Sequence, residues 1–195
     1  MPKRRSRSAV LTIPNVMSVV RMALIPLYLW LYCRRAAYGA AAAVLALSGV
    51  TDMLDGRIAR QFGQETDVGR VLDPIADKLT QAALIVSLAG RYRRIPALLA
   101  LFAAKETLVA AAGAVVLART GKVHSARWYG KLSTFVLEAS MGVLILFPRV
   151  AAGTADALIA VCAAALAGAG ACYFVYDLRL LRAAVRSGDA PEPPP

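Results

Sequence analysis

The chain has 195 residues, of which 58% are hydrophobic and 18% charged, and its formal net charge is +11. Soluble globular domains contain about 45–50% apolar residues. Apolar runs of about 15–20 residues recur along this whole chain, so the lipid bilayer is its expected surroundings. Soluble enzymes and disulfide-stabilised secreted domains are therefore disfavoured. Cys33, Cys162 and Cys172 lie in apolar stretches without a C-x-x-C pair, which disfavours a redox or zinc site.

Six apolar segments predict an all-α fold, an integral membrane bundle of six transmembrane helices. The first follows a basic N-terminus, runs to Tyr32 and lacks the small-residue cleavage pattern of a signal peptide. The other five cover approximately residues 38–53, 75–89, 95–117, 132–147 and 155–178. Residues 1–185 are expected to form one membrane domain, and the proline-rich residues 186–195 a disordered tail.

Basic residues predict the orientation of these helices. Fifteen of the 23 lie in the terminal segments and in the second-to-third and fourth-to-fifth connections, whereas six lie in the connections of the opposite side. The positive-inside rule therefore places both termini and the polar residues 55–70 on the cytoplasmic side of the cell membrane. The excess charge is explained by this topology and by attraction to anionic lipid. Nucleic acid is not an expected partner, because the basic residues are dispersed along the chain.

Four carboxylates flank the second-to-third connection: Asp52, Asp55, Asp73 and Asp77. If the second helix continues through Arg60, Asp52 and Asp55 share one face of it, and Asp73 and Asp77 are one turn apart on the third helix. Ionised carboxylates near the membrane need cations, and hard oxygen ligands suit Mg²⁺ or Mn²⁺. Two divalent cations would balance the four charges. The alternatives are an ordinary solvated loop and the ion pathway of a small carrier.

Small and basic residues accompany the carboxylates. Gly56 and Gly69 leave room for a bulky ligand, and the guanidinium of Arg60 matches phosphate oxygens. The string D-x2-D-G-x2-A-R-x8-G-x3-D-x3-D, from Asp52 to Asp77, resembles the signature of the CDP-alcohol phosphatidyltransferases at every defined position.

An upstream element also resembles this family, P-N-x-x-T-x-x-R, which here reads Pro14-Asn15-x-x-Ser18-x-x-Arg21 with serine in place of threonine. The resemblance implies a six-helix, usually homodimeric membrane enzyme that transfers a phosphatidyl group from CDP-diacylglycerol to a small polar alcohol and releases CMP. It implies these metal ligands, the last also being the proton acceptor: Asp52, Asp55, Asp73 and Asp77. It implies these contacts to CDP-diacylglycerol: Asn15, Ser18, Gly56, Arg60 and Thr66.

Basic residues around the fourth-to-fifth connection are the candidate acceptor-binding groups: Lys105, Lys122, Arg127 and Lys131. A phosphate-bearing acceptor needs such cations, although the last three equally fit a positive-inside loop. Lys105 and Glu106 lie within an apolar span, and they form either a self-neutralising pair at a helix interface or an element of the site.

The fragment G-K-x-x-T, which begins at Gly130, resembles phosphatidylglycerophosphate synthases most. Their usual R-E pair is Lys105-Glu106 here, and Ser133 stands where they carry a second basic residue. Glycerol 3-phosphate is the expected acceptor. Within the family the alternative is a cardiolipin synthase that uses phosphatidylglycerol; outside it, the alternative is a small ion-binding membrane carrier.

Overall fold

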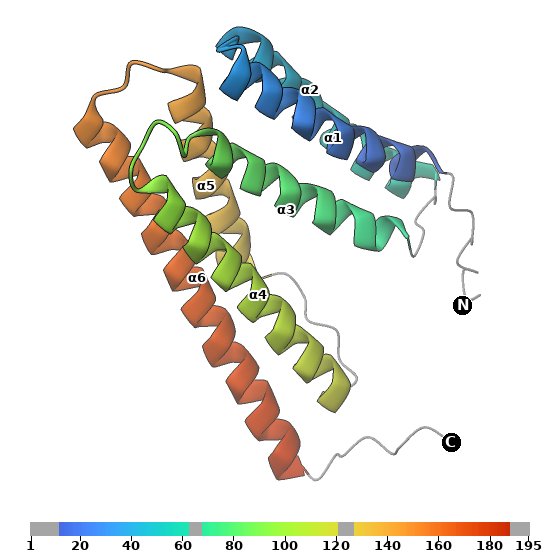
Figure 1. Ribbon diagram of the computed structural model, residues 1–195. Helices are drawn as coiled ribbons and strands as arrows, with labels where there is room; N and C mark the ends of the chain where they lie inside the picture. The colour runs from blue at the N-terminus through green and yellow to red at the C-terminus, as the bar shows by residue number, and fades with distance from the viewer. Residues whose placement is uncertain (1–11, 63–67, 121–126, 188–195) are drawn as a thin grey trace. The chain divides into compact units, whose positions relative to one another are not determined.

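The computed structural model describes residues 12–62, 68–120 and 127–187 of the chain. Within these ranges the protein is helical and has no strand (Figure 1). The elements are α1 (Ile13–Leu29), the π-helical turn η1 (Trp30–Arg34), α2 (Tyr38–Phe62), α3 (Gly69–Ser87), α4 (Ile95–Thr120), α5 (Trp128–Leu146) and α6 (Ala152–Ser187). The predicted all-α fold is confirmed. These helices form two compact units, the first with α1, η1, α2 and α3, the second with α4, most of α5 and α6.

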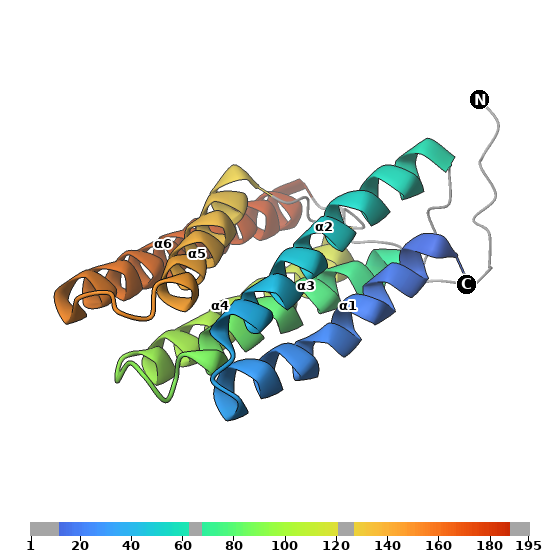
Figure 2. The same ribbon diagram turned by 90° about the horizontal axis from the view of Figure 1, so that it is seen from above.

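In the first unit α1 contacts both α2 and α3 (Figures 1 and 2). Pro14 stands in the first turn of α1, where a missing backbone N–H is tolerated. The helix widens into η1, and Ala36 then adopts a φ of 50°, a left-handed conformation that turns the chain into α2. This short reversal makes α1 and α2 neighbours and leaves the other side of α1 to α3.

The first unit has apolar side chains both in its core and on its surface. Tyr28 and Ile85 are buried, and the Tyr28 hydroxyl donates a hydrogen bond of 2.7 Å to Ser87 Oγ, which joins α1 to α3. Large apolar side chains are also exposed on α1 and α2: Val16, Val19, Val20, Leu47 and Val50. An apolar exterior over a packed interior is typical of helices surrounded by lipid.

The second unit is built on the packing of α4 along α6. Leu98 on α4 and Ile159 and Leu166 on α6 are among its buried side chains. The thiol of Cys162 on α6 donates to the carbonyl of Val136 on α5 over 3.7 Å, so α5 is joined to the same unit. Small residues recur along α6 and permit this close helix packing.

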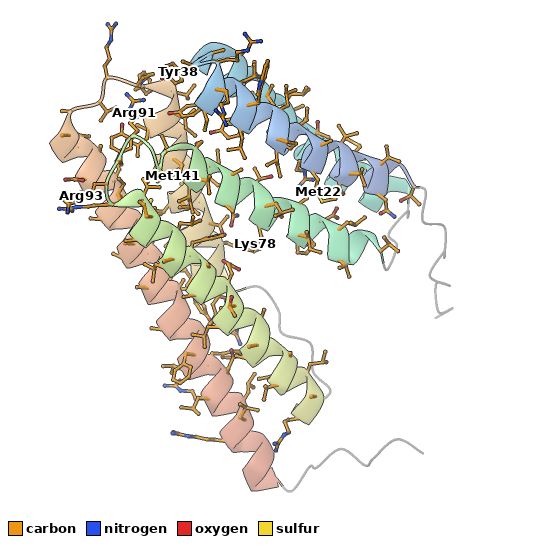
Figure 3. The ribbon with its side chains drawn as sticks, viewed as in Figure 1. Met22, Tyr38, Lys78, Arg91, Arg93 and Met141 are labelled. Carbon is orange, nitrogen blue, oxygen red and sulfur yellow. The ribbon has the colours of Figure 1, made fainter. Side chains whose placement is uncertain are left out.

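Four of the segments that the structure describes are long and apolar enough to cross a membrane: Asn15–Arg34, Ile95–Arg119, Trp128–Leu146 and Ala152–Arg182. The apolar part of α2 is shorter, Tyr38–Thr51, and α3 carries Asp73, Asp77 and Lys78. The protein is thus a multi-pass membrane protein with six helices, while the expected count of six spans stays a prediction. Arg91 and Arg93 lie on the connection that precedes α4, where a loop was expected (Figure 3).

Several helices extend beyond the apolar segments that predicted them. The second apolar segment was expected to end near residue 53, but α2 continues to Phe62, and α3 begins at Gly69 rather than near residue 75. At the C-terminus α6 continues to Ser187, and the rest of the expected tail lies outside the described residues. Hydropathy marks only the apolar part of a helix, whereas arginine and other charged helix formers continue it into water.

Candidate active site

Three polar residues form a buried stripe along α1. Asn15, Ser18 and Arg21 are spaced three residues apart and are 3%, 0% and 2% exposed, although their neighbours Val16 and Val19 face outward. Residues at this spacing lie on one face of a helix, which here is the packed face. Burial of polar groups and of a charge within an apolar helix requires partners. The stripe therefore predicts polar groups on the helices that pack against α1.

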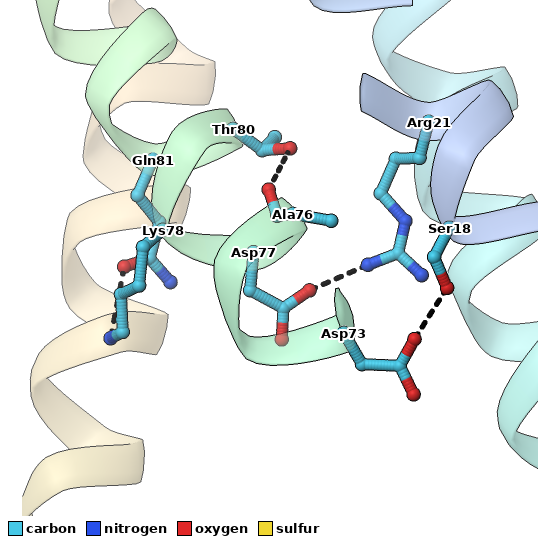
Figure 4. A network of polar contacts seen from close by, with 8 residues as sticks. All are labelled: Ser18, Arg21, Asp73, Ala76, Asp77, Lys78, Thr80 and Gln81. Carbon is cyan, nitrogen blue, oxygen red and sulfur yellow. Dashed lines mark hydrogen bonds and ion pairs between the residues drawn. The ribbon is translucent and has the colours of Figure 1, made fainter. Parts of the chain in front are cut away.

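Those partners include two carboxylates of α3. The Ser18 hydroxyl donates a hydrogen bond to Asp73 Oδ1, and Nη1 of Arg21 lies 2.6 Å from Asp77 Oδ1 (Figure 4). Asp73 and Asp77 are one helical turn apart, as expected, and Ser18 and Arg21 are nearly one turn apart on α1. Two donors on one helix thus face two carboxylates on the other, so the structure brings together four residues of the two sequence motifs.

The exposure of these groups differs sharply. The side chain of Arg21 is 3% exposed, whereas that of Asp77 is 49% exposed. The guanidinium therefore contacts Asp77 from the protein side, and the carboxylate also borders open space. Lys78 points away from this contact, and its Nζ lies 3.4 Å from Gln81 Oε1 (Figure 4).

The α2 part of the expected site is described by its backbone alone. Because α2 is continuous to Phe62, Asp52, Asp55, Gly56 and Arg60 all lie on one helix, as the predicted spacing requires. Their side chains, and the whole of residue Thr66, lie outside the described part of the structure. Among the side chains that are described, no group of three or more His, Cys, Asp or Glu residues could hold a metal ion. The four-carboxylate metal site stays a prediction.

Lys105 of α4 is buried in the second unit. Its side chain is 6% exposed, its Nζ lies 2.7 Å from Glu106 Oε1, and its Cγ lies 3.4 Å from the point where a Cβ would stand on Gly170 of α6. These contacts fit a self-neutralising pair at a helix interface, and a part of Lys105 in acceptor binding stays a prediction. The Lys105 charge is therefore partly balanced before any ligand binds.

The other candidate acceptor residues differ in their surroundings. The guanidinium carbon of Arg127 lies 3.8 Å from the centre of the Tyr176 ring, and the backbone N–H of Arg127 donates to the Tyr173 hydroxyl over 3.2 Å. Lys131 is exposed on α5, and Lys122 lies outside the described residues. Nearby, the buried Ser133 donates its hydroxyl to the carbonyl of Gly130 over 2.9 Å. Arg127 is thus held by α6, whereas no such contact fixes Lys131 within the described residues.

Sequence reasoning assigned no role to Arg21, which the structure places against a predicted catalytic carboxylate. The sequence did indicate a role for Arg21, because a charge inside an apolar span is costly and Arg21 is three positions after Ser18, on the same face of the helix. Its partner is 56 residues away on another helix, and spacing within one helix does not determine such a pairing.

The family model for CDP-alcohol phosphatidyltransferases matches residues 11–170 of the chain. A cardiolipin synthase (CMP-forming) of Streptomyces coelicolor is 39% identical over 193 residues, which cover 90% of this chain and 87% of the relative. A probable phosphatidylglycerophosphate synthase of Mycobacterium tuberculosis is 28% identical over 145 residues, 72% of this chain and 68% of the relative. A CDP-diacylglycerol–glycerol-3-phosphate 3-phosphatidyltransferase of Pseudomonas fluorescens is 42% identical over 80 residues, 40% of this chain and 41% of the relative.

Proposed function

Because the chain belongs to the CDP-alcohol phosphatidyltransferase family, we propose that it transfers a phosphatidyl group from CDP-diacylglycerol to an alcohol and releases CMP. The observation that carries the proposal is the contact between the α1 stripe and Asp73 and Asp77 of α3. In the reaction the acceptor oxygen forms a bond to the phosphorus that bears diacylglycerol. The bond from this phosphorus to the CMP oxygen breaks, and the hydroxyl proton passes to a carboxylate.

The donor groups fit a divalent cation. Asp73 and Asp77 supply hard oxygen ligands one turn apart on α3, and α2 carries Asp52 and Asp55 at helical spacing. We propose that these four residues hold two divalent cations, Mg²⁺ or Mn²⁺. When bound, such cations neutralise charge on the diphosphate and on the departing CMP.

The chain's own residues perform the remaining steps. Asp77 is the proposed proton acceptor, and its half-exposed side chain leaves access for an acceptor hydroxyl. Ser18 donates its hydroxyl to Asp73 and orients that carboxylate, and Ser18 stays a proposed contact to the CDP-diacylglycerol head group. Asn15 remains a proposed contact to the CDP-diacylglycerol head group, together with Gly56, Arg60 and Thr66.

Two acceptors are supported by different observations. The S. coelicolor relative, which covers 90% of this chain, is named a cardiolipin synthase, and this name favours phosphatidylglycerol. The Lys105–Glu106 pair favours it too, because a neutralised lysine contributes less to the binding of a doubly charged phosphate monoester than a free cation does. Glycerol 3-phosphate is the second candidate, favoured by the relatives from P. fluorescens and M. tuberculosis.

The charge distribution and the family also support proposals about the orientation, the lipid surroundings and the oligomeric state of the enzyme. The excess of basic residues in the terminal segments and two connections supports cytoplasmic termini and a cytoplasmic active site in the cell membrane. On this side the site would meet its nucleotide product in water. Membrane lipid would surround the exposed apolar side chains, and a second copy of the chain would complete a homodimer.

A single assay distinguishes the acceptors. Purified protein in detergent receives radiolabelled CDP-diacylglycerol with phosphatidylglycerol, with glycerol 3-phosphate, or with neither, and the lipid products are separated by chromatography. Formation of cardiolipin with phosphatidylglycerol alone supports the first acceptor. Formation of phosphatidylglycerophosphate with glycerol 3-phosphate alone establishes the second. Arg127→Ala is expected to raise the KM for the true acceptor and leave the KM for CDP-diacylglycerol nearly unchanged.

A further inference from the structure

Arg21 is a cation within the apolar segment Asn15–Arg34, and the proposed reaction leaves it without a task. An ionised side chain at such a place is costly unless it is paired, so its retention needs an explanation. The explanation lies in the partner, because Nη1 of Arg21 lies 2.6 Å from Asp77 Oδ1. A contact this short between a guanidinium and a carboxylate is a charge-assisted hydrogen bond.

The two carboxylates of α3 meet α1 in unequal ways. Asp73 receives a hydrogen bond from the neutral hydroxyl of Ser18, whereas Asp77 receives one from a cation (Figure 4). A neutral donor orients a carboxylate and leaves its charge in place. A guanidinium also orients it, but it opposes the binding of another cation to the same group. The two neighbouring carboxylates therefore differ in the charge of the donor that contacts each of them.

The contact is buried on the Arg21 side and open on the Asp77 side. Arg21 is buried to within 3% of its side chain, so its guanidinium is held by the surrounding protein. Asp77 keeps half of its side chain exposed, so the carboxylate still has an accessible edge. A buried partner that grips one oxygen of a half-exposed carboxylate limits its rotation without covering it.

We propose that Arg21 is a positioning residue that fixes the Asp77 carboxylate and weakens cation binding at it relative to Asp73. This inference rests on the proposed function of the site and assigns different roles to its two α3 carboxylates. Asp73 serves as a strong cation ligand. Asp77 is restrained toward the acceptor side and binds a cation weakly enough to remain available for the acceptor hydroxyl.

The test measures Mn²⁺ binding to full-length protein in detergent by electron paramagnetic resonance, without lipid substrate. Arg21→Gln removes the charge and keeps a polar side chain, so Mn²⁺ should bind about tenfold or more tightly than to the wild type. Turnover at saturating Mn²⁺ should fall about 10–100-fold, because the carboxylate loses its fixed position, while the KM for CDP-diacylglycerol stays nearly constant. Equal or weaker Mn²⁺ binding by Arg21→Gln would overturn the inference.

Two further variants distinguish an effect of the Arg21 charge on Mn²⁺ affinity from an effect of misfolding. Arg21→Lys keeps the charge but offers a point donor in place of the guanidinium fork, so its Mn²⁺ affinity should stay within about threefold of wild type and its turnover should be intermediate. Arg94→Gln is the matched control, because it also removes one arginine from an ion pair, the exposed contact of 3.6 Å to Asp156. It should leave Mn²⁺ binding unchanged. Tightening by Arg21→Lys or Arg94→Gln as large as by Arg21→Gln would contradict the role of charge at this position.

The outcomes also separate this inference from the proposed function. Wild-type protein that binds Mn²⁺ and forms product, with an Arg21→Gln variant of unchanged affinity, would refute the role of Arg21 alone. Wild-type protein that forms product but binds no Mn²⁺ would refute the metal site and this inference with it. Wild-type protein that binds Mn²⁺ but forms no product with any alcohol would refute the proposed reaction, and tighter binding by Arg21→Gln would still support the effect on affinity.

Discussion

Gly130 of α5 lies close to Tyr173 of α6, and this contact predicts how much a larger side chain at position 130 would destabilise the protein. A Cβ on Gly130 would lie 2.3 Å from the Tyr173 hydroxyl oxygen and 3.0 Å from its ring carbon Cε2. Tyr173 is 7% exposed, its ring centre lies 4.7 Å from that of Tyr129, and its hydroxyl accepts the N–H of Arg127. Gly130→Ala must therefore displace a tyrosine that is fixed by several contacts.

The balance of the terms sets the expected destabilisation. The displaced hydroxyl loses a hydrogen bond worth about 1 kcal/mol, and the ring pair is worth roughly 0.5–1.5 kcal/mol. The higher helix propensity of alanine offsets about 1 kcal/mol of this loss. Adding the strain of overpacking, which is typically about 1–3 kcal/mol, Gly130→Ala should lower the free energy of unfolding by about 1.5–4.5 kcal/mol.

Gly142 on the same helix provides the matched control, because no atom beyond its chain neighbours and the adjacent backbone of α5 lies within 4 Å of the position of its Cβ. Gly142→Ala should be neutral or stabilising by up to about 1 kcal/mol. The measurement is reversible unfolding of each variant in mixed micelles of a mild detergent and dodecyl sulfate. Tyr173→Phe removes the oxygen of the closest contact and should recover part of the loss when combined with Gly130→Ala. If Gly130→Ala and Gly142→Ala are equally stable, the described packing of α5 on α6 is wrong.

Three other predictions concern the proposed reaction. A chelator should abolish activity and added Mg²⁺ or Mn²⁺ should restore it, whereas full activity in excess chelator would exclude the proposed cations. Asp77→Asn should lower turnover by about 10²–10⁴-fold with CDP-diacylglycerol still bound, because the amide cannot accept the proton; near-normal turnover would place the base elsewhere. In a cysteine-free background, cysteines at Thr66 and Ser125 should be labelled only from the cytoplasmic side and one at Arg93 only from outside; the reverse pattern would contradict the orientation.

The sequence predicts well which helices carry the site residues, because the spacing of residues along one helix is a local property of the sequence. The Asp73 and Asp77 spacing places both carboxylates on one turn of α3, and their contacts to α1 agree with a shared face. The continuity of α2 through Arg60 was a condition of the motif interpretation, and the structure confirms it. Hydropathy alone would have ended this helix earlier, since its last two turns carry Arg57 and Arg60.

The sequence alone could not predict which residues of different helices contact one another. The spacing of Ser18 and Arg21 defines a face of α1, but the register against α3 depends on how the two helices pack. For the same reason the sequence alone did not show which residues surround Lys105, whereas the structure places it against Glu106 and beside Gly170. Adjacent charges in a chain can point to different neighbours, so only the packed structure identifies the pair.

The most direct test of the central claim is CMP release from CDP-diacylglycerol by purified protein in detergent with Mg²⁺ and the acceptor alcohols. We expect one CMP for each phospholipid formed. We expect none from Asp73→Asn, which loses an anionic ligand while its fold should persist, because Asp73 is only partly buried. If the wild-type protein releases no CMP with any acceptor yet binds divalent cations, the carboxylates serve a small ion-binding carrier, and the proposed transferase reaction is wrong.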